Sequence, residues 1–274
     1  MKISKILILL VGIILLIPSF YSHGNLLISP TRVTFDERQR VATVVVINNS
    51  DEHRTYRLSW QEKTAKPTGG YITLDKDTVN PTALSNMIRM SPSQVRLAPG
   101  ERQTVKLALR KPQGLKEQEY RSHLLFQALP NENKNKNIGI KVNLILSYSI
   151  PVILRQGTEP PVLDIKSIEL KKQQERKSLL ISIAKEGKYS SFGKVEVFYK
   201  PNSTEKEVKV AMVSDYSIYS EVPVSKLSLS FFEGSKITSA GKLRIVYSGL
   251  KEYREKVFTE KTVDIDANSL GLLH

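Results

Sequence analysis

The chain has 274 residues, of which 40% are hydrophobic and 25% charged. This composition is typical of a globular protein and excludes a largely disordered chain or a polytopic membrane protein. The 41 lysines and arginines exceed the 27 acidic residues, and the formal net charge of +14 permits an acidic partner without selecting one. The chain has no cysteine, which excludes disulfides, thiolate metal sites and thiol nucleophiles. At about 100 to 200 residues per domain, the length favours two domains.

Residues 1–24 have the pattern of a secretory signal peptide. Lys2 and Lys5 precede the apolar run 6–17, which ends at a proline and is short for a membrane span. The alternative is an uncleaved membrane anchor. We place cleavage after Gly24, so the sequence predicts an exported protein with a net charge of about +12 that folds without disulfides.

The chain that follows shows short stretches of alternating apolar and polar residues separated by turn-forming residues, and helical periodicity is hard to find. An all-β fold is therefore expected. In chain order, the predicted strands cover residues 26–35, 40–48, 55–62, 87–97, 103–110, 120–129 and 138–155. Seven strands suit one immunoglobulin-like β-sandwich, which we assign to residues 25–155.

Residues 156–161 interrupt this pattern with Gly157, Pro160 and Pro161, and we interpret them as a short linker. A second β-sandwich is expected over residues 162–274. Its predicted strands cover residues 162–170, 178–184, 194–199, 207–213, 222–232, 241–247 and 256–265.

The last strand predicted for the first domain is unusually long. Every second residue from Ile138 to Leu154 is apolar, which exceeds the length of an ordinary strand. One interpretation is a bent strand that crosses the core. The other is a strand that lends its apolar row to the sheet of a partner, because an exposed strand edge is a template for strand addition. Periodicity alone leaves both open.

Enzyme chemistry has little support in the sequence. A catalytic or metal site needs convergent polar groups, and no two of the four histidines have metal-ligand spacing. They lie in the signal peptide, a polar turn, a predicted strand and the last position: His23, His53, His123 and His274. The sequence therefore predicts neither catalysis nor a metal or other cofactor.

Four segments of the first domain resemble one known family in their order and spacing. They are Ser29–Phe35, the hairpin 95–105 with its Leu-x-Pro-Gly-x-x-Gln core, Glu119–Pro130, and Ile150–Arg155. The family is that of the periplasmic chaperones of the chaperone/usher pathway, which assemble pili and fimbriae. The resemblance covers residues 26–155, and the second domain matches only in length and β character.

This resemblance implies two immunoglobulin-like domains in a boomerang arrangement, with a cleft that binds pilus or fimbrial subunits. It further implies donor-strand complementation, in which the long strand completes the unfinished fold of a subunit. By position, Val142, Leu144 and Leu146 correspond to the donor residues, and Ile140 extends the row.

The resemblance also assigns roles to charged residues. Arg32 corresponds to a cleft arginine that holds the carboxylate of the subunit, and its loss is expected to weaken binding while the melting temperature stays near wild type. Where well-known members carry a cleft lysine, this chain has Pro151, so the second carboxylate anchor stays open. Glu119 and Arg155 correspond to a structural ion pair between the domains, and Asp266 is the acid expected from the second domain.

The sequence therefore predicts a periplasmic chaperone whose partners are pilus or fimbrial subunits and an outer-membrane usher. Neither nucleic-acid binding nor membrane insertion after signal cleavage is expected. The alternative is a secreted immunoglobulin-like adhesive or ligand-binding module. Such a module would carry polar or aromatic clusters at its loop tips, and Tyr216 with Tyr219 is the tyrosine pair that hints at one.

Overall fold

The computed structural model describes residues 26–130 and 146–266, apart from residues 76, 174, 175, 203–205, 236 and 238. The predicted signal peptide and the row members Ile140, Val142 and Leu144 lie outside these ranges. The described elements are β-strands and two single-turn 3₁₀ helices, η1 (Ser85–Met87) and η2 (Lys251–Tyr253), which confirms the all-β prediction. No helix in the described ranges is long and apolar enough to span a membrane.

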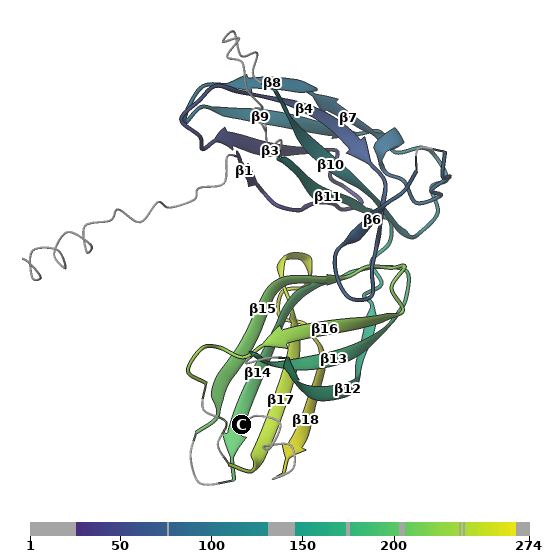
Figure 1. Cartoon of the computed structure of the whole chain (residues 1–274). Helices are drawn as coiled ribbons and strands as arrows, with labels where there is room; N and C mark the ends of the chain where they lie inside the picture. The colour runs from purple at the N-terminus through teal and green to yellow at the C-terminus, as the bar shows by residue number, and fades with distance from the viewer. Residues whose placement is uncertain are drawn as a thin grey trace, which may run out of the picture.

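The first domain is a sandwich of two sheets (Figure 1). In spatial order, one sheet contains β1 (Leu26–Ser29), β3 (Val41–Asn48), β9 (Arg102–Leu109) and β7 (Ile88–Ser91). The other contains β2 (Val33–Phe35), β11 (Ser147–Arg155), β10 (Glu119–Leu129), β4 (Arg54–Gln61) and β8 (Gln94–Leu97). Inward-facing residues of both sheets form one core, which includes Val33, Phe35, Val44, Tyr56, Leu107, Leu124, Phe126 and Val152.

Two strands predicted as continuous are each divided between the two sheets. The segment 26–35 forms β1 and β2, and the segment 87–97 forms β7 and β8. A proline lies between the two strands of each pair, Pro30 in the first and Pro92 in the second. Because proline lacks an N–H group, the ladder breaks there and the chain crosses to the opposite sheet.

A hairpin of β5 (Lys63–Ala65) and β6 (Tyr71–Thr73) was not predicted from the sequence. Its strands are too short to show an alternating pattern, and none of their residues is fully buried. Gly69 and Gly70 form its turn with φ values of 87° and 74°, a conformation that favours glycine. In Figure 1 this hairpin extends from the first domain toward the second.

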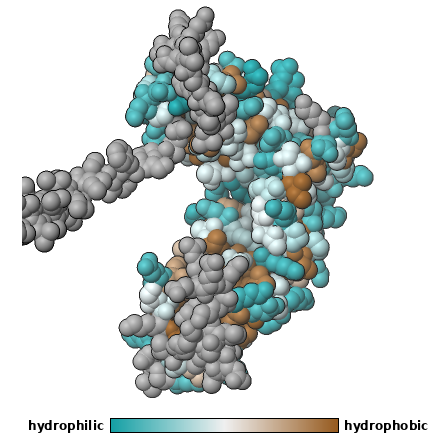
Figure 2. Space-filling model, viewed as in Figure 1, coloured by the Kyte–Doolittle hydropathy of each residue, from teal (hydrophilic) through white to brown (hydrophobic). Residues whose placement is uncertain are grey.

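The second domain is also a two-sheet sandwich, with its own core. One sheet contains β12 (Val162–Gln173), β13 (Arg176–Glu186) and β16 (Val224–Ser230). The other contains β15 (Val208–Ile218), β14 (Ser191–Pro201), β17 (Gly241–Gly249) and β18 (Val257–Ile265). The two domains meet at an angle and leave one side of the molecule hollow, in agreement with the boomerang expected from the sequence (Figures 1 and 2).

Candidate functional site

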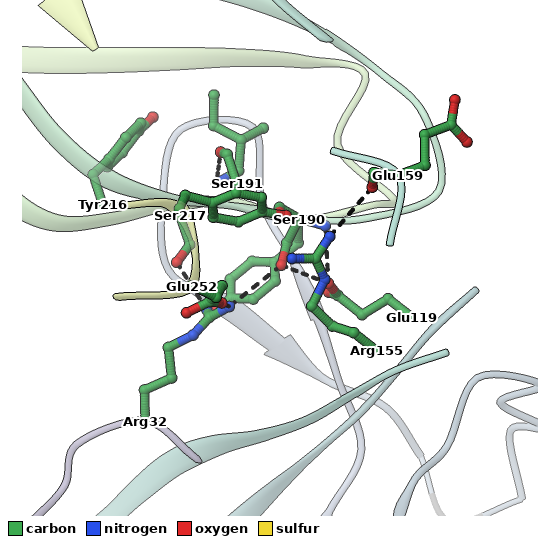
Figure 3. A network of polar contacts seen from close by, with 12 residues as sticks. Arg32, Glu119, Arg155, Glu159, Ser190, Ser191, Tyr216, Ser217 and Glu252 are labelled. Carbon is green, nitrogen blue, oxygen red and sulfur yellow. Dashed lines mark hydrogen bonds and ion pairs between the residues drawn. The ribbon is translucent and has the colours of Figure 1, made fainter. Parts of the chain in front are cut away.

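Arg32, in the segment between β1 and β2, is only 5% exposed and contacts the second domain (Figure 3). Its guanidinium donates to the hydroxyls of Ser217 (3.1 Å) and Ser190 (3.5 Å) and pairs with the Glu252 carboxylate on η2 at 3.4 Å. It also lies over the ring of Phe192, 4.6 Å from the centroid. The structure therefore places Arg32 within the interface between the domains, with an acid partner already bound.

Glu119 and Arg155 lie directly opposite each other on β10 and β11, and both face the second domain. The buried carboxylate of Glu119 accepts hydrogen bonds from the backbone N–H (2.9 Å) and the hydroxyl (2.7 Å) of Ser190. The Arg155 guanidinium lies over the rings of Tyr189 and Tyr253, at 4.8 and 4.6 Å from their centroids. Both side chains thus contribute contacts between the domains.

Asp266 follows β18 at the end where Ile265 is paired with Gly241. The interface residues lie near the other end of this sheet, where Gly249 is paired with Gly193. The length of β17 separates the two ends by about 25 Å, at about 3.3 Å per residue. The structure therefore does not bring Asp266 to Glu119 and Arg155, and the second domain instead contributes acids from its turns.

Glu221 is one of these acids, and it forms an ion pair with Arg121 of β10. Arg121 also donates to the carbonyl of Lys63 (3.1 Å) and lies over the ring of Tyr219, 3.9 Å from the centroid. The Glu221 carboxylate accepts a hydrogen bond from the N–H of Ala65 at 2.8 Å. Burial by itself would raise the pKa of Glu221, but its hydrogen bonds and charge contact with Arg121 hold the pKa below the ordinary value.

The β5–β6 hairpin adds further contacts between the domains. The Pro67 carbonyl accepts hydrogen bonds from the N–H of Lys226 (2.7 Å) and the hydroxyl of Ser225 (3.3 Å). The hydroxyls of Tyr71 and Tyr219 lie 2.8 Å apart. Glu221, Glu252 and the hairpin lie in turns or very short strands, which explains why alternation along the sequence did not single them out.

The tyrosine pair considered for the alternative function does not form an exposed cluster. Tyr219 is buried against Arg121 and Tyr71, and Tyr216 is half-buried with its hydroxyl bonded to Ser225. Both tyrosines are committed to contacts within the molecule, so they offer no loop-tip surface for a ligand.

The long predicted strand changes its environment along its length. β11 pairs with β10 from Ser147 to Arg155, whereas β2 covers its other edge only from Val152 to Leu154. Among the described residues, no second strand covers this edge from Ser147 to Pro151. The apolar row is fully buried at Val152, and Leu146 is 41% exposed. One end of the row therefore belongs to the core, and the other leaves the core beside the part of the β11 edge that no described strand covers.

Lys63 contacts β11 from a distant part of the sequence. Its ammonium group donates to the hydroxyl of Ser149 on β11 at 2.7 Å. Burial lowers its pKa, and within the described ranges no carboxylate forms an ion pair with it. Pro151, on the same face of β11, lies opposite His123 of β10. Lys63 is thus a cation next to the position where the sequence lacks one.

The described residues contain no group of three histidine, aspartate or glutamate side chains that could hold a metal ion. This observation concerns only the described ranges.

Among the comparisons with known proteins, a match to a protein-family model concerns the first domain. The family model for the PapD N-terminal domain, described as a pili and flagellar-assembly chaperone, matches residues 25–157. No curated protein sequence gives a significant match.

Similar solved structures include the CsuC–CsuE chaperone–tip adhesion subunit complex from Acinetobacter baumannii, with 15% identity, a TM-score of 0.43, and coverage of 88% of this chain and 98% of that chain. The SafB chaperone with the SafA pilin from Salmonella enterica has 11% identity, a TM-score of 0.44, and coverage of 89% and 98%. The CupB2 chaperone of Pseudomonas aeruginosa has 15% identity, a TM-score of 0.39, and coverage of 87% and 98%.

The family model spans the whole first sandwich, from β1 through β11, and includes Arg32, Glu119 and the unpaired edge. The first domain therefore matches the family model of pili and flagellar-assembly chaperones over its whole length, which supports the resemblance found in the sequence.

Proposed function

We propose that this protein is a periplasmic chaperone that binds pilus or fimbrial subunits by donor-strand complementation and delivers them to an outer-membrane usher. The observation that carries the proposal is the edge of β11 from Ser147 to Pro151, beside which the apolar row passes from the core at Val152 to an exposed Leu146. The family of the first domain supports the class of partner, and both family and fold are those of chaperones rather than enzymes.

An unpaired strand edge presents N–H and C=O groups that another strand satisfies by joining the sheet. An apolar row beside that edge fills a groove in an incomplete sandwich, so burial and backbone hydrogen bonds act together. In this proposal the donor row is Ile140, Val142, Leu144 and Leu146, of which Leu146 lies within the described ranges.

The proposed location follows from residues 1–24, whose pattern is that of a cleaved signal peptide. Export would place the mature chain in the periplasm without membrane insertion, between newly secreted subunits and the usher. Nucleic acid has no place in this proposal, in spite of the positive net charge.

The proposal is tested by purifying the mature protein from the periplasm of its host and identifying bound proteins by tandem mass spectrometry. We expect one or a few pilus or fimbrial subunits in stoichiometric amounts. Recovery of the chaperone with no such subunit, under conditions in which the fibres are made, would contradict the proposal.

Arg32 enters the proposal as the anchor for the carboxylate of the subunit, since a guanidinium binds a carboxylate through two parallel hydrogen bonds. Its present contact with Glu252 sets a condition, because Glu252 must release Arg32 before another carboxylate binds. These contacts also revise the expectation of unchanged stability. Arg32→Ala removes hydrogen bonds to Ser190 and Ser217, so we now expect a lower melting temperature.

For Arg32→Ala we expect subunit affinity to fall about tenfold to a hundredfold, the loss typical of a charge-assisted contact. Isothermal titration calorimetry with the copurified subunit measures it. Glu252→Gln is the matched control, because it weakens the same contact between the domains but leaves the guanidinium available. If both variants lose affinity equally, Arg32 acts only through the domain interface and is not the anchor.

A further inference from the structure

The outward face of the sheet formed by β1, β3, β9 and β7 carries a band of apolar side chains. Side chains alternate across a strand, so every second residue of these strands points away from the core. On β1 and β3 the outward residues include Leu27, Val41, Val45 and Ile47. Leu27 is 50% exposed and Val41 44%, and neither Val45 nor Ile47 belongs to the core cluster. Leu27 is paired with Ile47, so the band is continuous across the two strands.

The other half of this face is basic. Exposed cations lie on β7, on β9 and directly after β9: Arg89, Arg102, Lys106 and Arg110. Arg102 is paired with Ile47, so the basic half adjoins the apolar band. The four strands contain no aspartate or glutamate. None of the four cations forms an ion pair with a carboxylate of the described residues.

The second domain shows the opposite arrangement. Most basic side chains on its sheet of β15, β14, β17 and β18 pair with acids: Lys194 and Lys209 with Glu196, Arg244 with Glu207 and Glu260, and Lys242 with Asp264. Acids in turns near the basic face of the first domain are engaged by other groups: Asp36, Glu37 and Glu101 by backbone N–H groups and Glu52 by Arg54. The positive charge of the first-domain face is therefore not neutralised within the sheet, whereas that of the second-domain sheet largely is.

We infer that the face formed by β1, β3, β9 and β7 binds an anionic membrane surface. A bilayer places anionic headgroups next to an apolar interior over its whole area, so it offers a partner to both halves of the face at once. The cations contact headgroup phosphates, and Leu27 and Val41 enter the boundary between headgroups and acyl chains. A free phosphate or a nucleic acid offers nothing to the apolar band.

In this arrangement the protein lies on the membrane and does not span it. The edge of β11 belongs to the opposite sheet of the sandwich, so it stays accessible while the face is bound. The inference therefore does not depend on the proposed binding of subunits.

The test uses the full-length mature protein and vesicle flotation. One set of vesicles contains phosphatidylcholine alone, and the other contains in addition about 30% phosphatidylglycerol, which makes the surface potential negative. We expect the wild type to bind the anionic vesicles at least about tenfold more tightly. Arg102→Glu combined with Lys106→Glu should weaken this binding about thirtyfold or more, because each cation near an anionic surface contributes roughly fivefold.

Lys188→Glu combined with Lys200→Glu is the matched control for charge. Both lysines are exposed in the second domain, and the pair changes the net charge equally, so we expect binding close to that of the wild type.

Leu27→Ser combined with Val41→Ser tests the apolar band and should weaken binding to anionic vesicles about fivefold. Val162→Ser with Val257→Ser is the matched control, since both valines are exposed in the second domain. Circular dichroism melting identifies a variant that fails to fold, and Lys106→Glu or Val41→Ser alone then repeats its test.

Equal binding of the wild type to both sets of vesicles, or binding to neither, overturns the inference. It is also overturned if the face variants bind as their controls do. A loss in the glutamate variant with none in the serine variant indicates a general contact with polyanions, which contradicts a membrane site.

Discussion

Aspartate at Leu146 should abolish subunit capture while the free protein melts near the wild-type temperature. Leu146 is 41% exposed, so a charge at this position stays in contact with water in the free protein. In the proposed complex the same charge would be buried in an apolar groove, at a cost of several kcal/mol. A loss of about 3 kcal/mol or more reduces affinity more than about a hundredfold. Circular dichroism melting and copurification of the subunit measure the two effects.

Val152→Asp is the matched control, because Val152 has the same parity on the same segment and is fully buried. A buried unpaired charge is among the most destabilising changes, so we expect the first domain to lose about 4 kcal/mol or more and to unfold. Leu144→Asp should behave like Leu146→Asp. If Leu146→Asp unfolds the free protein, or captures subunit as well as the wild type does, the donor role of this row is wrong.

The free energy of unfolding should fall as the pH is lowered from about 6.5 to about 3, because of His123. Burial, followed by the charges of Arg121 and Lys63, lowers the pKa of His123 to about 3. The side chain is 1% exposed, and neither ring nitrogen has a hydrogen-bond partner among the described residues. An unfolded histidine has a pKa of about 6.5.

Above about pH 6.5 the imidazole is neutral in both states and contributes no pH dependence. Below that pH the unfolded chain binds a proton that the folded protein excludes, so stability decreases by about 1.4 kcal/mol per pH unit. At pH 4.5 the loss from this single group is about 2 to 3 kcal/mol. The stability that depends on a neutral His123 is therefore fully present above the unfolded pKa of about 6.5. It is lost progressively as the pH falls toward the folded pKa of about 3.

His123→Phe isolates this contribution. A phenylalanine ring keeps the edge-on packing against Tyr71, whose centroid lies 4.6 Å away, but it does not titrate. Urea unfolding between pH 4.5 and 7.5 should show a slope shallower by about one proton for the variant. Glu221 and the other carboxylates titrate in both proteins, and their effect cancels in the difference. Parallel stability curves would show that the folded protein protonates His123 normally.

The strands and the two sandwiches were predictable because side chains alternate across a strand with a period of two. In β3 and β9 this alternation marks the face that packs on the core, whichever sheet lies opposite. The positions of Pro30 and Pro92 also explain why two predicted strands each divide between sheets, although alternation alone treated each as continuous. The alternation of apolar residues from 138 to 154 predicted a long apolar row, but it left open where that row leaves the core.

Only the tertiary structure decided which polar groups meet. Arg32 contacts Glu252 across 220 positions of sequence, and Lys63 reaches Ser149 across 86. The period of a strand specifies which side faces inward, but it does not specify which turn of another domain lies opposite. The three-residue strands β5 and β6 and the turns that carry Glu221 and Glu252 have no periodic signal of their own. Their roles come from the angle at which the two sandwiches dock, since that angle brings these turns to the end of the sheet where β10 begins and β11 ends.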